Sequence, residues 1–585
     1  MPLIPRRFVW FVLLLILSTP GIAAARAVGP DQKLDPVLRA RASAPSATSR
    51  VIIRTFPGAS AAAAIKAVGG TAGRSLPVLH AQVAIVPDSA LVRLAARPEV
   101  ISVGVDRRVH GAIERTSAAV GASWVREELG FDGSGVGVAI IDSGVANWHD
   151  DLGSDRVTHF ADFVTYLPTP HDDYGHGTHV AGIIAGSGYD SGGARRGIAP
   201  GASLIVLKVL DETGDGYISN VIAAIDYAVE QRTRLNIRVL NLSVSAGVFE
   251  SYNTDPFTLA AKRAVDAGIV VITAAGNLGR NDKGQVQHGG ITAPGIAPWV
   301  LTVGASNHHR TANRNDDTLA PFSSRGPTSI DGDLKPDVVA PGVGIESLAA
   351  VGSTLYNSSP GSRLAGTVDT AAAPYFAMTG TSMAAPVVTG TVALMLEANP
   401  DLTPNLVKAI LHYTAERRSR YDAAAQGAGF LNARGAVQLA TALQDGVSLS
   451  SADKGAPAWS RQILWGKKRL RGGVITAAAS AWHPDVAWGA SVAADGSEIT
   501  WGKNADGVTD WRATNTSTPP EPEPFYHLAD LSTSGPTDLR TYFRPTDSRT
   551  YAPTDLFPTH GPRDLPTDGP SMPAALTRAQ EVRGR

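Results

Sequence analysis

The sequence predicts an α/β protein built on a parallel β-sheet sandwiched by helices, with a small α+β module before it and a β-rich, then disordered, extension after it. Three observations lead to this fold class. Between residues 116 and 442, continuous apolar runs alternate with helical patterns. Residues 50–112 contain shorter strands and helices. From 443 to 515, Trp-Gly pairs recur at strand-like segments. With 585 residues, 43% of them hydrophobic, the chain can form several domains.

The first 27 residues have the pattern of an export signal peptide. Arg6 and Arg7 form a basic start, residues 8–17 an apolar core, and residues 23–27 a small-residue cleavage site. The core is shorter than the roughly 20 residues that a membrane helix needs. We therefore expect a secreted protein without a membrane partner. Residues 28–49, rich in Ala, Arg, Pro and Ser, predict a linker.

The module at residues 50–112 shows a β-α-β-α-β order, which suggests a split, ferredoxin-like α/β sandwich. Ser60 is a plausible helix cap, and Gly69 follows the end of that helix. By itself, this module could be any small binding domain. The predicted strands are 51–53, 79–86 and 101–105, and the predicted helices are 60–68 and 89–96.

The region 116–442 carries apolar runs that are too continuous for a sheet with one solvated face. Ligands of such parallel sheets bind beyond the carboxyl ends of the strands. The predicted strands are 136–141, 203–209, 239–242, 269–274 and 300–303, with helices at 218–229, 259–267 and 384–396.

Charge and cysteine content exclude some functions. The net charge of −1 gives no reason to expect a nucleic-acid partner. The absence of cysteine excludes disulfides, thiolate metal sites and a cysteine nucleophile.

Asp142 and His176 are candidates for acid–base chemistry. Asp142 directly follows the strand 136–141. A buried carboxylate at this place needs a hydrogen-bond partner, and an imidazole as partner would form a pair suited to acid–base catalysis. His176 lies between two glycines before a helix, so other backbone can approach its ring. A turn cap at Asp142 and a metal pair of His176 with His179 are the alternatives, although the other ligands of a zinc helix motif are missing.

Ser382 and Asn277 complete the set of candidates. Ser382 lies in the segment 380–386, where glycine and small residues open an apolar helix, so that its hydroxyl lies beside backbone N–H donors. Asn277 follows an apolar strand, and its neutral amide can donate to a developing oxyanion. A helix cap and a loop turn are the alternatives for these two residues.

Taken together and in order, four motifs resemble those of the subtilisin-like serine peptidases, the subtilases. The resemblance covers residues 116–442 and implies that Ser382 is the nucleophile, His176 its general base and Asp142 the residue that orients the imidazole. It also implies that Asn277 and the Ser382 backbone N–H bind the oxyanion. The motifs are Asp142-Ser143-Gly144, His176-Gly177-Thr178-His179-Val180-Ala181-Gly182, Ala275-Gly276-Asn277 and Gly380-Thr381-Ser382-Met383-Ala384-Ala385-Pro386.

The resemblance also implies how a protein substrate binds. An extended peptide would lie between residues 213–216 and 242–245 and use main-chain hydrogen bonds. Thr292 stands where the family often has glycine at the pocket floor, which implies a shallower pocket, and Asp215 would favour basic residues nearby. The implied substrate-binding residues are Gly214, Asp215, Gly216, Ser243, Val244, Ser245, Ala274, Ala275, Gly276 and Thr292.

The same resemblance implies that residues 50–112 are a propeptide. This propeptide would inhibit the enzyme until the chain is cut between His110 and Ala118. An insertion between Gly344 and Gly380 distinguishes the chain from compact subtilisins. Asp151 matches a carboxylate that binds calcium in many relatives, but residues 187–196 lack the usual asparagine-rich pattern. We therefore expect that no cofactor is required and that structural calcium is not favoured.

The last 143 residues are less informative about function. The tryptophans of 443–515 are more typical of a core than of a ligand-binding face. Residues 516–585 repeat Pro-Thr-Asp with few apolar residues, which predicts disorder. The alternative function is a catalytically silent adhesion protein that keeps the peptidase fold and binds through this C-terminal region.

Overall fold

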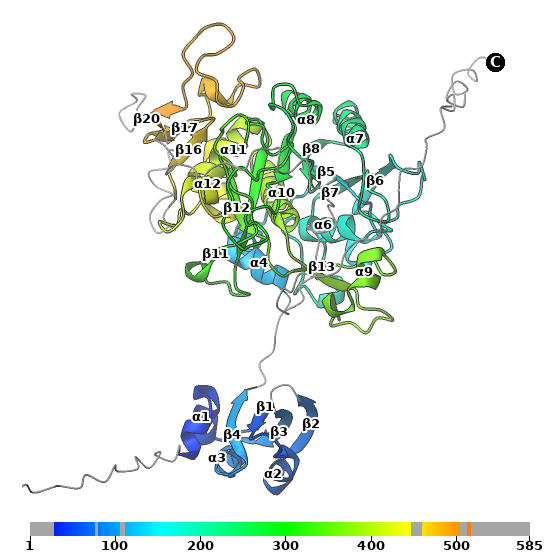
Figure 1. Cartoon of the computed structure of the whole chain (residues 1–585), viewed down its shortest axis with the longest axis vertical. Helices are drawn as coiled ribbons and strands as arrows, with labels where there is room; N and C mark the ends of the chain where they lie inside the picture. The colour runs from blue at the N-terminus through cyan, green and yellow to red at the C-terminus, as the bar shows by residue number, and fades with distance from the viewer. Residues whose placement is uncertain (1–28, 77–79, 106–111, 446–458, 504–511, 516–585) are drawn as a thin grey trace, which may run out of the picture. The chain divides into compact units, whose positions relative to one another are not determined.

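The computed structural model describes residues 29–76, 80–105, 112–445, 459–503 and 512–515 (Figure 1). The chain divides into two compact units, Met1–His110 and Gly111–Arg585. The predicted signal peptide and the predicted disordered tail lie outside the described residues.

The N-terminal unit has the predicted ferredoxin-like arrangement. Its four strands form an antiparallel sheet in the order β2-β3-β1-β4, and helices follow β1 and β3. The strand β2 was not predicted, because its sequence TAGRSL lacks a clear apolar alternation. The elements are β1 Thr48–Thr55, α2 Ala61–Ala67, β2 Thr71–Leu76, β3 Ala81–Pro87, α3 Leu91–Ala95 and β4 Val100–Val105.

The predicted linker at residues 28–49 is wrong, because most of this segment belongs to the folded N-terminal unit. Asp35 caps helix α1 (Pro36–Ser43) by accepting from Leu38 N at 2.8 Å, and its other oxygen accepts from Val105 N at 2.6 Å. Leu34 and Leu38 are buried in the core of this unit. Two apolar anchors in an Ala- and Arg-rich stretch are too few to give a recognisable helical period.

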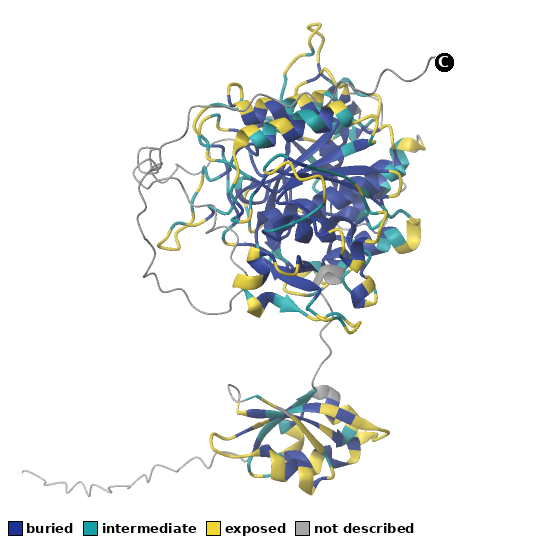
Figure 2. Cartoon of the chain, turned by 90° about the vertical axis from the view of Figure 1, so that its right-hand side faces the viewer, coloured by how far each residue is buried: buried dark blue, intermediate teal, exposed yellow. Residues whose placement is uncertain are grey.

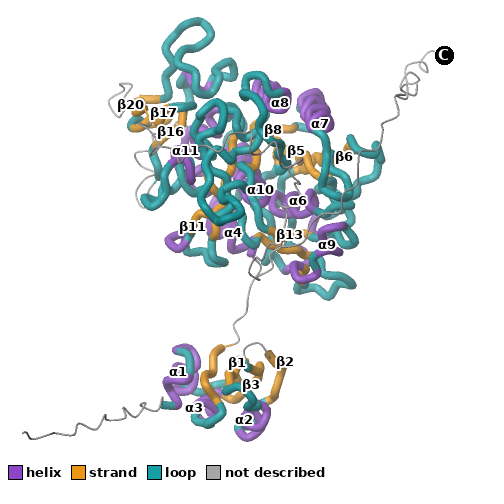
Figure 3. The backbone as a smooth tube through the Cα atoms, viewed as in Figure 1, coloured by secondary structure: helices purple, strands orange, loops and turns teal. Residues whose placement is uncertain are grey.

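The second unit is organised around an eight-stranded sheet (Figure 3) in the order β11-β10-β9-β8-β5-β7-β6, with β12 also paired to β10. All pairs are parallel except that of β10 with the short β11. The five predicted strands are confirmed as β5 and β7 to β10. The strands are β5 Gly137–Asp142, β6 Val157–Asp162, β7 Ser203–Lys208, β8 Ile237–Leu242, β9 Val270–Ala274, β10 Leu301–Asn307, β11 Thr318–Leu319 and β12 Val338–Pro341.

Helices cover both faces of this sheet, as predicted. In β5, Val138 and Ile140 face the core that contains α6, α10, α11 and α13, whereas Ala139 and Ile141 face the core that contains α7 and α8. The strands are therefore buried on both sides (Figure 2). The helices are α6 His176–Ala185, α7 Ile218–Gln231, α8 Pro256–Asp266, α10 Thr381–Ala398, α11 Pro404–Thr414 and α13 Ala433–Gln444.

Among the described residues, α10 is the one helix that is long and apolar enough to cross a membrane by length and composition. In the structure, 89% of that window is buried. This burial is typical of the central helix of a folded core.

Shorter elements complete the second unit. The predicted insertion between Gly344 and Gly380 contains a three-stranded antiparallel sheet in the order β13-β15-β14. The shorter elements are α4 Ala112–Val120, α5 Ala122–Trp124, β13 Ile345–Leu348, α9 Thr354–Ser358, β14 Arg363–Leu364, β15 Tyr375–Met378 and α12 Ala423–Gln426.

The C-terminal extension packs on the sheet domain as part of one core. The buried rings of Trp465 and Trp488 lie 4.7 Å apart between centroids, and both belong to the same cluster as α10 and α11. The prediction of core-forming tryptophans is confirmed, but residue 443 does not begin a separate compact unit. The strands are β16 Gln462–Trp465, β17 Lys468–Arg471, β18 Val474–Ile475, β19 Gly502–Lys503 and β20 Arg512–Asn515.

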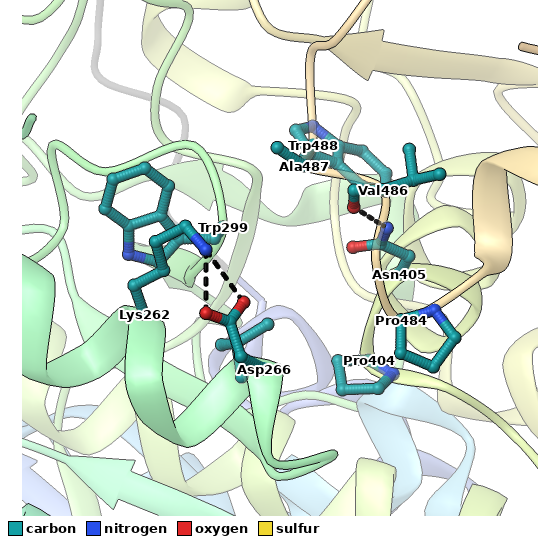
Figure 4. Close-up of a pocket in the computed structure, with 10 residues that line it drawn as sticks. Lys262, Asp266, Trp299, Pro404, Asn405, Pro484, Val486, Ala487 and Trp488 are labelled. Atoms are coloured by element: carbon teal, nitrogen blue, oxygen red, sulfur yellow. Dashed lines mark hydrogen bonds and ion pairs between the residues drawn. The ribbon is translucent and has the colours of Figure 1, made fainter. Parts of the chain in front are cut away.

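A small pocket lies where this extension meets α8 and the start of α11 (Figure 4). Asn405 Nδ2 donates to Val486 O at 2.8 Å and to Ala481 O at 3.1 Å. On the other side, Lys262 pairs with Asp266. The Asn405 bonds fix the loop of the extension to the first turn of α11.

Candidate active site

Asp142 and His176 form a buried hydrogen-bonded pair. Asp142 is the last residue of β5, and His176 is the first residue of α6. His176 Nδ1 lies 2.7 Å from Asp142 Oδ1, and both side chains are fully buried. Because a carboxylate accepts, Nδ1 carries the proton and Nε2 is the basic nitrogen.

Glycines allow the strand end and the helix start to come this close. A Cβ at Gly177 would lie 2.2 Å from Gly144 O. Gly144 has a φ of +119°, and a Cβ there would lie 2.0 Å from His171 O. Backbone therefore meets backbone between the two motifs, and side chains at these positions would push Asp142 and His176 apart.

Ser382 is the second residue of α10, after the N-cap Gly380 and the first helical residue Thr381. Its Oγ donates to Ser243 O at 3.1 Å, and Ser243 Oγ donates to Ser382 O at 3.0 Å. Helix α10 packs against α6, which carries His176. The predicted nucleophile and the predicted substrate-binding residue Ser243 are therefore direct neighbours.

The amide of Asn277 has a defined orientation. Its Oδ1 accepts from Thr381 N and from Thr381 Oγ1, each at 3.0 Å. Thr381 Oγ1 in turn accepts from Gly276 N at 3.2 Å. With the oxygen held by Thr381, the NH₂ group faces the other way, as an oxyanion donor requires.

The predicted pocket residues Ala275, Gly276 and Thr292 lie together. Thr292 N donates to Ala275 O at 3.2 Å. A Cβ at Gly276 would lie 2.9 Å from Thr292 Cγ2. Ala274 ends strand β9 next to them. The threonine side chain therefore occupies space beside the glycine that a smaller residue would leave open.

The predicted peptide-binding segments follow β7 and β8, the two neighbours of β5. Gly214 lies against the Tyr174 ring, and Asp215 Oδ2 accepts from Thr213 Oγ1 at 3.1 Å. Gly216 follows on this segment. Val244 is buried and Ser245 half-buried on the other segment. The segments leave the sheet on opposite sides of Asp142, and their role in peptide binding stays a prediction.

His179 has a structural environment, which disfavours a metal pair with His176. Its Nε2 donates to Ile345 O at 3.1 Å and to Phe376 O at 3.0 Å. Burial, together with the nearby His176, lowers the pKa of His179 to about 3. The ring is therefore a neutral donor that ties α6 to the insertion sheet.

Both carboxylate oxygens of Asp151, the residue that matches a calcium ligand of relatives, accept hydrogen bonds from protein donors. Asp151 Oδ1 accepts from Asp190 N and Oδ2 from Tyr375 Oη, each at 2.8 Å, while His149 Nε2 donates to Pro374 O at 2.7 Å. Burial and the charge of Asp151 raise the pKa of Asp190. Within the described part of the chain, this histidine and the two carboxylates are the one group spaced for a metal. Protein donors already use both Asp151 oxygens, whereas calcium needs several oxygen ligands.

A buried Asp–His pair beyond a parallel sheet, with a serine at the start of a core helix, defines an α/β serine hydrolase. The sequence model of the subtilase family matches residues 133–437, more than half of the chain. The chain belongs to this family of serine endopeptidases.

Two bacterial proteases agree with this assignment. Serine protease AprX of Bacillus subtilis strain 168 is 37% identical over 359 residues, which are 60% of this chain and 78% of that protein. Subtilisin E of the same organism is 32% identical over 377 residues, 63% of this chain and 84% of that protein. A solved structure of a cold-adapted subtilisin-like serine proteinase is 29% identical and covers 52% of this chain and 90% of its own, with a TM-score of 0.39.

Two kinds of supporting residue were missed: Thr381 stands inside a motif that assigns it no role, and Asp172 lies outside all four motifs. Thr381 holds Asn277, and Asp172 binds the start of α6. Lys208 Nζ donates to Ser143 O at 2.7 Å. The signal for Asp172 is a carboxylate shortly before a helix whose N-cap is glycine, which cannot supply a capping side chain.

Proposed function

We propose that this protein is a secreted serine endopeptidase that cleaves proteins through an acyl-enzyme. Ser382 attacks the carbonyl carbon of the scissile bond while His176 Nε2 takes the hydroxyl proton. The imidazolium then gives that proton to the leaving amine, and Asp142 stabilises its charge. Water, activated by the same imidazole, releases the acyl group from Ser382.

The observation that carries the proposal is the 2.7 Å bond between His176 Nδ1 and Asp142 Oδ1. It fixes the tautomer that a general base needs. The orientation of Asn277 supports the proposal independently, because its amide and the Ser382 N–H are the two donors proposed for the oxyanion. No cofactor takes part in these steps, and we propose that none is required.

Substrate recognition is proposed to be broad. A peptide in extended conformation would pair with the segments 213–216 and 242–245. Because Thr292 fills space beside Gly276, we expect small side chains to be accepted better than aromatic ones at the primary pocket. A strong preference for cleavage after aromatic residues would contradict this expectation.

The N-terminal unit is proposed to be a propeptide that the enzyme removes. Its ferredoxin-like fold and the boundary of this compact unit at His110 support this role. Thr116 and Ser117 are fully buried in α4, and Thr116 Oγ1 lies 3.0 Å from His308 Nε2. The processed bond should therefore precede Thr116.

Digestion of casein by wild type and by Ser382→Ala, with N-terminal sequencing of both products, tests the proposal. We expect casein cleavage and a new N-terminus between His110 and Thr116 in wild type alone. Equal activity and equal size of the two proteins would refute it. Failure of wild type to react with a fluorophosphonate serine reagent would instead support the silent adhesion protein.

A further inference from the structure

The loop before α6 contains a carboxylate that the proposed mechanism does not use. Asp172 Oδ1 accepts from Ser143 Oγ at 2.8 Å and from Gly175 N at 2.7 Å. Its Oδ2 accepts from Thr178 N at 2.8 Å and from Thr178 Oγ1 at 2.6 Å. Both oxygens are thus filled by donors from the two segments that carry Asp142 and His176.

From this geometry we propose that Asp172 is a positioning residue, which holds the Asp142 and His176 side chains in register for proton transfer. The proposal rests on the proposed catalytic roles of those two residues. Asp172 does not touch the reacting atoms. It acts through Ser143, which follows Asp142, and through Gly175 and Thr178, which enclose His176.

The first step of the argument is the cap of α6. The N-cap is Gly175, which has no side chain to receive the first N–H groups of the helix. Asp172 receives Thr178 N instead, and Ser143 Oγ receives Gly177 N at 2.9 Å. The start of the helix, and with it the His176 ring, is therefore oriented by groups outside the helix.

The second step concerns the turn after β5. Ser143 Oγ is held by Asp172, and Ser143 N donates to Asp142 Oδ1 at 2.8 Å. The carbonyl of Ser143 accepts from Lys208 Nζ, which also pairs with Asp173 at 2.6 Å. Two adjacent carboxylates thus hold Ser143. Asp172 binds its hydroxyl directly, and Asp173 positions the lysine that binds its carbonyl oxygen.

The third step is that four donors require an acceptor at both oxygens. In Asp172→Asn, the amide NH₂ group replaces one of the two accepting oxygens. It must then face either the backbone N–H of Gly175 or that of Thr178, so that two N–H donors point at each other without an acceptor. The hydrogen bonds on one side of residue 172, either to Ser143 and Gly175 or to Thr178, must therefore be lost. Misplacement of a catalytic group by about 1 Å can cost about 100-fold in rate.

We therefore expect Asp172→Asn to lower kcat for a peptide anilide by about 10- to 100-fold, with KM changed much less. The values are normalised to active sites titrated with a fluorophosphonate. The low-field proton resonance of the His176 Nδ1–H···Asp142 bond should shift or broaden, which a general loss of stability would not cause in folded protein.

Asp331→Asn is the matched control. Asp331 also joins two segments through both of its oxygens, because Oδ1 accepts from Ser251 Oγ at 2.6 Å and Oδ2 accepts from Tyr252 N at 3.1 Å, and neither donor belongs to the two catalytic segments. It should cost stability but leave kcat and the low-field resonance unchanged. An equal loss of kcat in both variants would reduce Asp172 to a structural residue and overturn the proposal.

Ser143→Ala keeps the proposal testable if Asp172→Asn does not fold. It removes the hydrogen bonds of Ser143 Oγ with Asp172 and with Gly177 N, so kcat should fall several-fold, and its effect should shrink in the Asp172→Asn background where both variants fold. Wild-type kcat together with an unshifted resonance in either variant would overturn the proposal. Retained activity in Ser382→Ala would instead refute the proposed catalytic site, which separates the two failures.

Discussion

Replacing Trp488 with Ala should destabilise the peptidase unit, although Trp488 lies outside the region that matches the family. Its ring covers a buried ionic cluster: the Lys408 Nζ lies 4.6 Å from the ring centroid, and the His412 ring packs edge-on at 5.4 Å. Its Nε1 donates to Leu464 O at 2.8 Å. Truncation of a buried tryptophan typically costs about 3–5 kcal/mol.

The charge of the cluster makes the lysine sensitive to this ring. Asp337 lies between Lys335 Nζ at 2.8 Å, Lys408 Nζ at 3.1 Å and His412 Nε2 at 3.2 Å. Two ammonium groups thus share one carboxylate. Burial and the neighbouring Lys335 lower the pKa of Lys408 to about 7, although Asp337 opposes this shift. The face of an indole can stabilise such a desolvated cation by about 2 kcal/mol.

The sign of the pH effect follows from this pKa. The folded-state pKa of Lys408 lies below the unfolded value of about 10.4. At a pH above the unfolded-state pKa, the lysine is neutral in both states and its lowered pKa does not reduce the free energy of unfolding. As the pH falls from there toward 7, the unfolded state binds the proton first, and the free energy of unfolding decreases. Below pH 7 the lysine is charged in both states, so the cation–π contribution of Trp488 should be largest there.

A double-mutant cycle of Trp488→Ala and Lys408→Met measures this contribution. Urea unfolding would be followed at pH 6 and pH 9 in the Ser382→Ala background, which prevents self-digestion. We expect a coupling free energy of about 2 kcal/mol at pH 6 that decreases toward zero at pH 9. Coupling that does not depend on pH, or a cost of Trp488→Ala below about 1 kcal/mol, would refute the reasoning.

Three further substitutions and a chelation test examine the candidate active site and the surroundings of Asp151. Thr381→Val removes the hydroxyl that holds Asn277, so kcat should fall while KM stays unchanged. The fall should be smaller than the loss of about 10²–10³-fold that follows deletion of an oxyanion donor. A kcat equal to that of wild type would contradict this expectation. Gly177→Ala places a Cβ 2.2 Å from a backbone oxygen, so the helix start must move and casein cleavage should be lost, with folding checked by circular dichroism. Tyr375→Phe removes a donor from Asp151 and should lower the free energy of unfolding by about 1–3 kcal/mol. Because Asp151 is satisfied by protein donors, EDTA should not accelerate thermal inactivation of wild type, and a faster inactivation would reveal a bound metal.

The catalytic candidates were predictable because each depends on local sequence. Asp142 follows a run of buried β-branched and aliphatic residues, and Ser382 opens a helix that is apolar on all sides. Parallel strands place their carboxyl ends at one edge of the sheet, so residues that directly follow different strands are expected to lie close together. The pair formed by Asp142 and His176 follows from this rule together with the glycines that permit close approach.

The supporting residues were not predictable in the same way, because their partners are distant in sequence. Asp172 and Ser143 are 29 positions apart, and Asn277 and Thr381 are 104 positions apart. A carboxylate or a threonine in a loop has many local roles, and only the folded chain shows which donors it receives. The helix α1 was missed for a related reason, since its stability depends on contacts with β4 that its own sequence does not encode.

The insertion and the C-terminal extension act on the central domain in a similar way. The insertion supplies Tyr375 and Pro374 to the buried Asp151 and His149, and the extension supplies Trp488 to the buried Lys408. A buried polar or charged group without a partner costs more free energy than a typical hydrogen bond returns. Each added segment covers or bonds to such a buried group, so its removal would expose the group or take away one of its partners. The sheet domain and its two additions therefore form one cooperative unit, in which each addition completes the surroundings of a buried polar or charged group of the central domain.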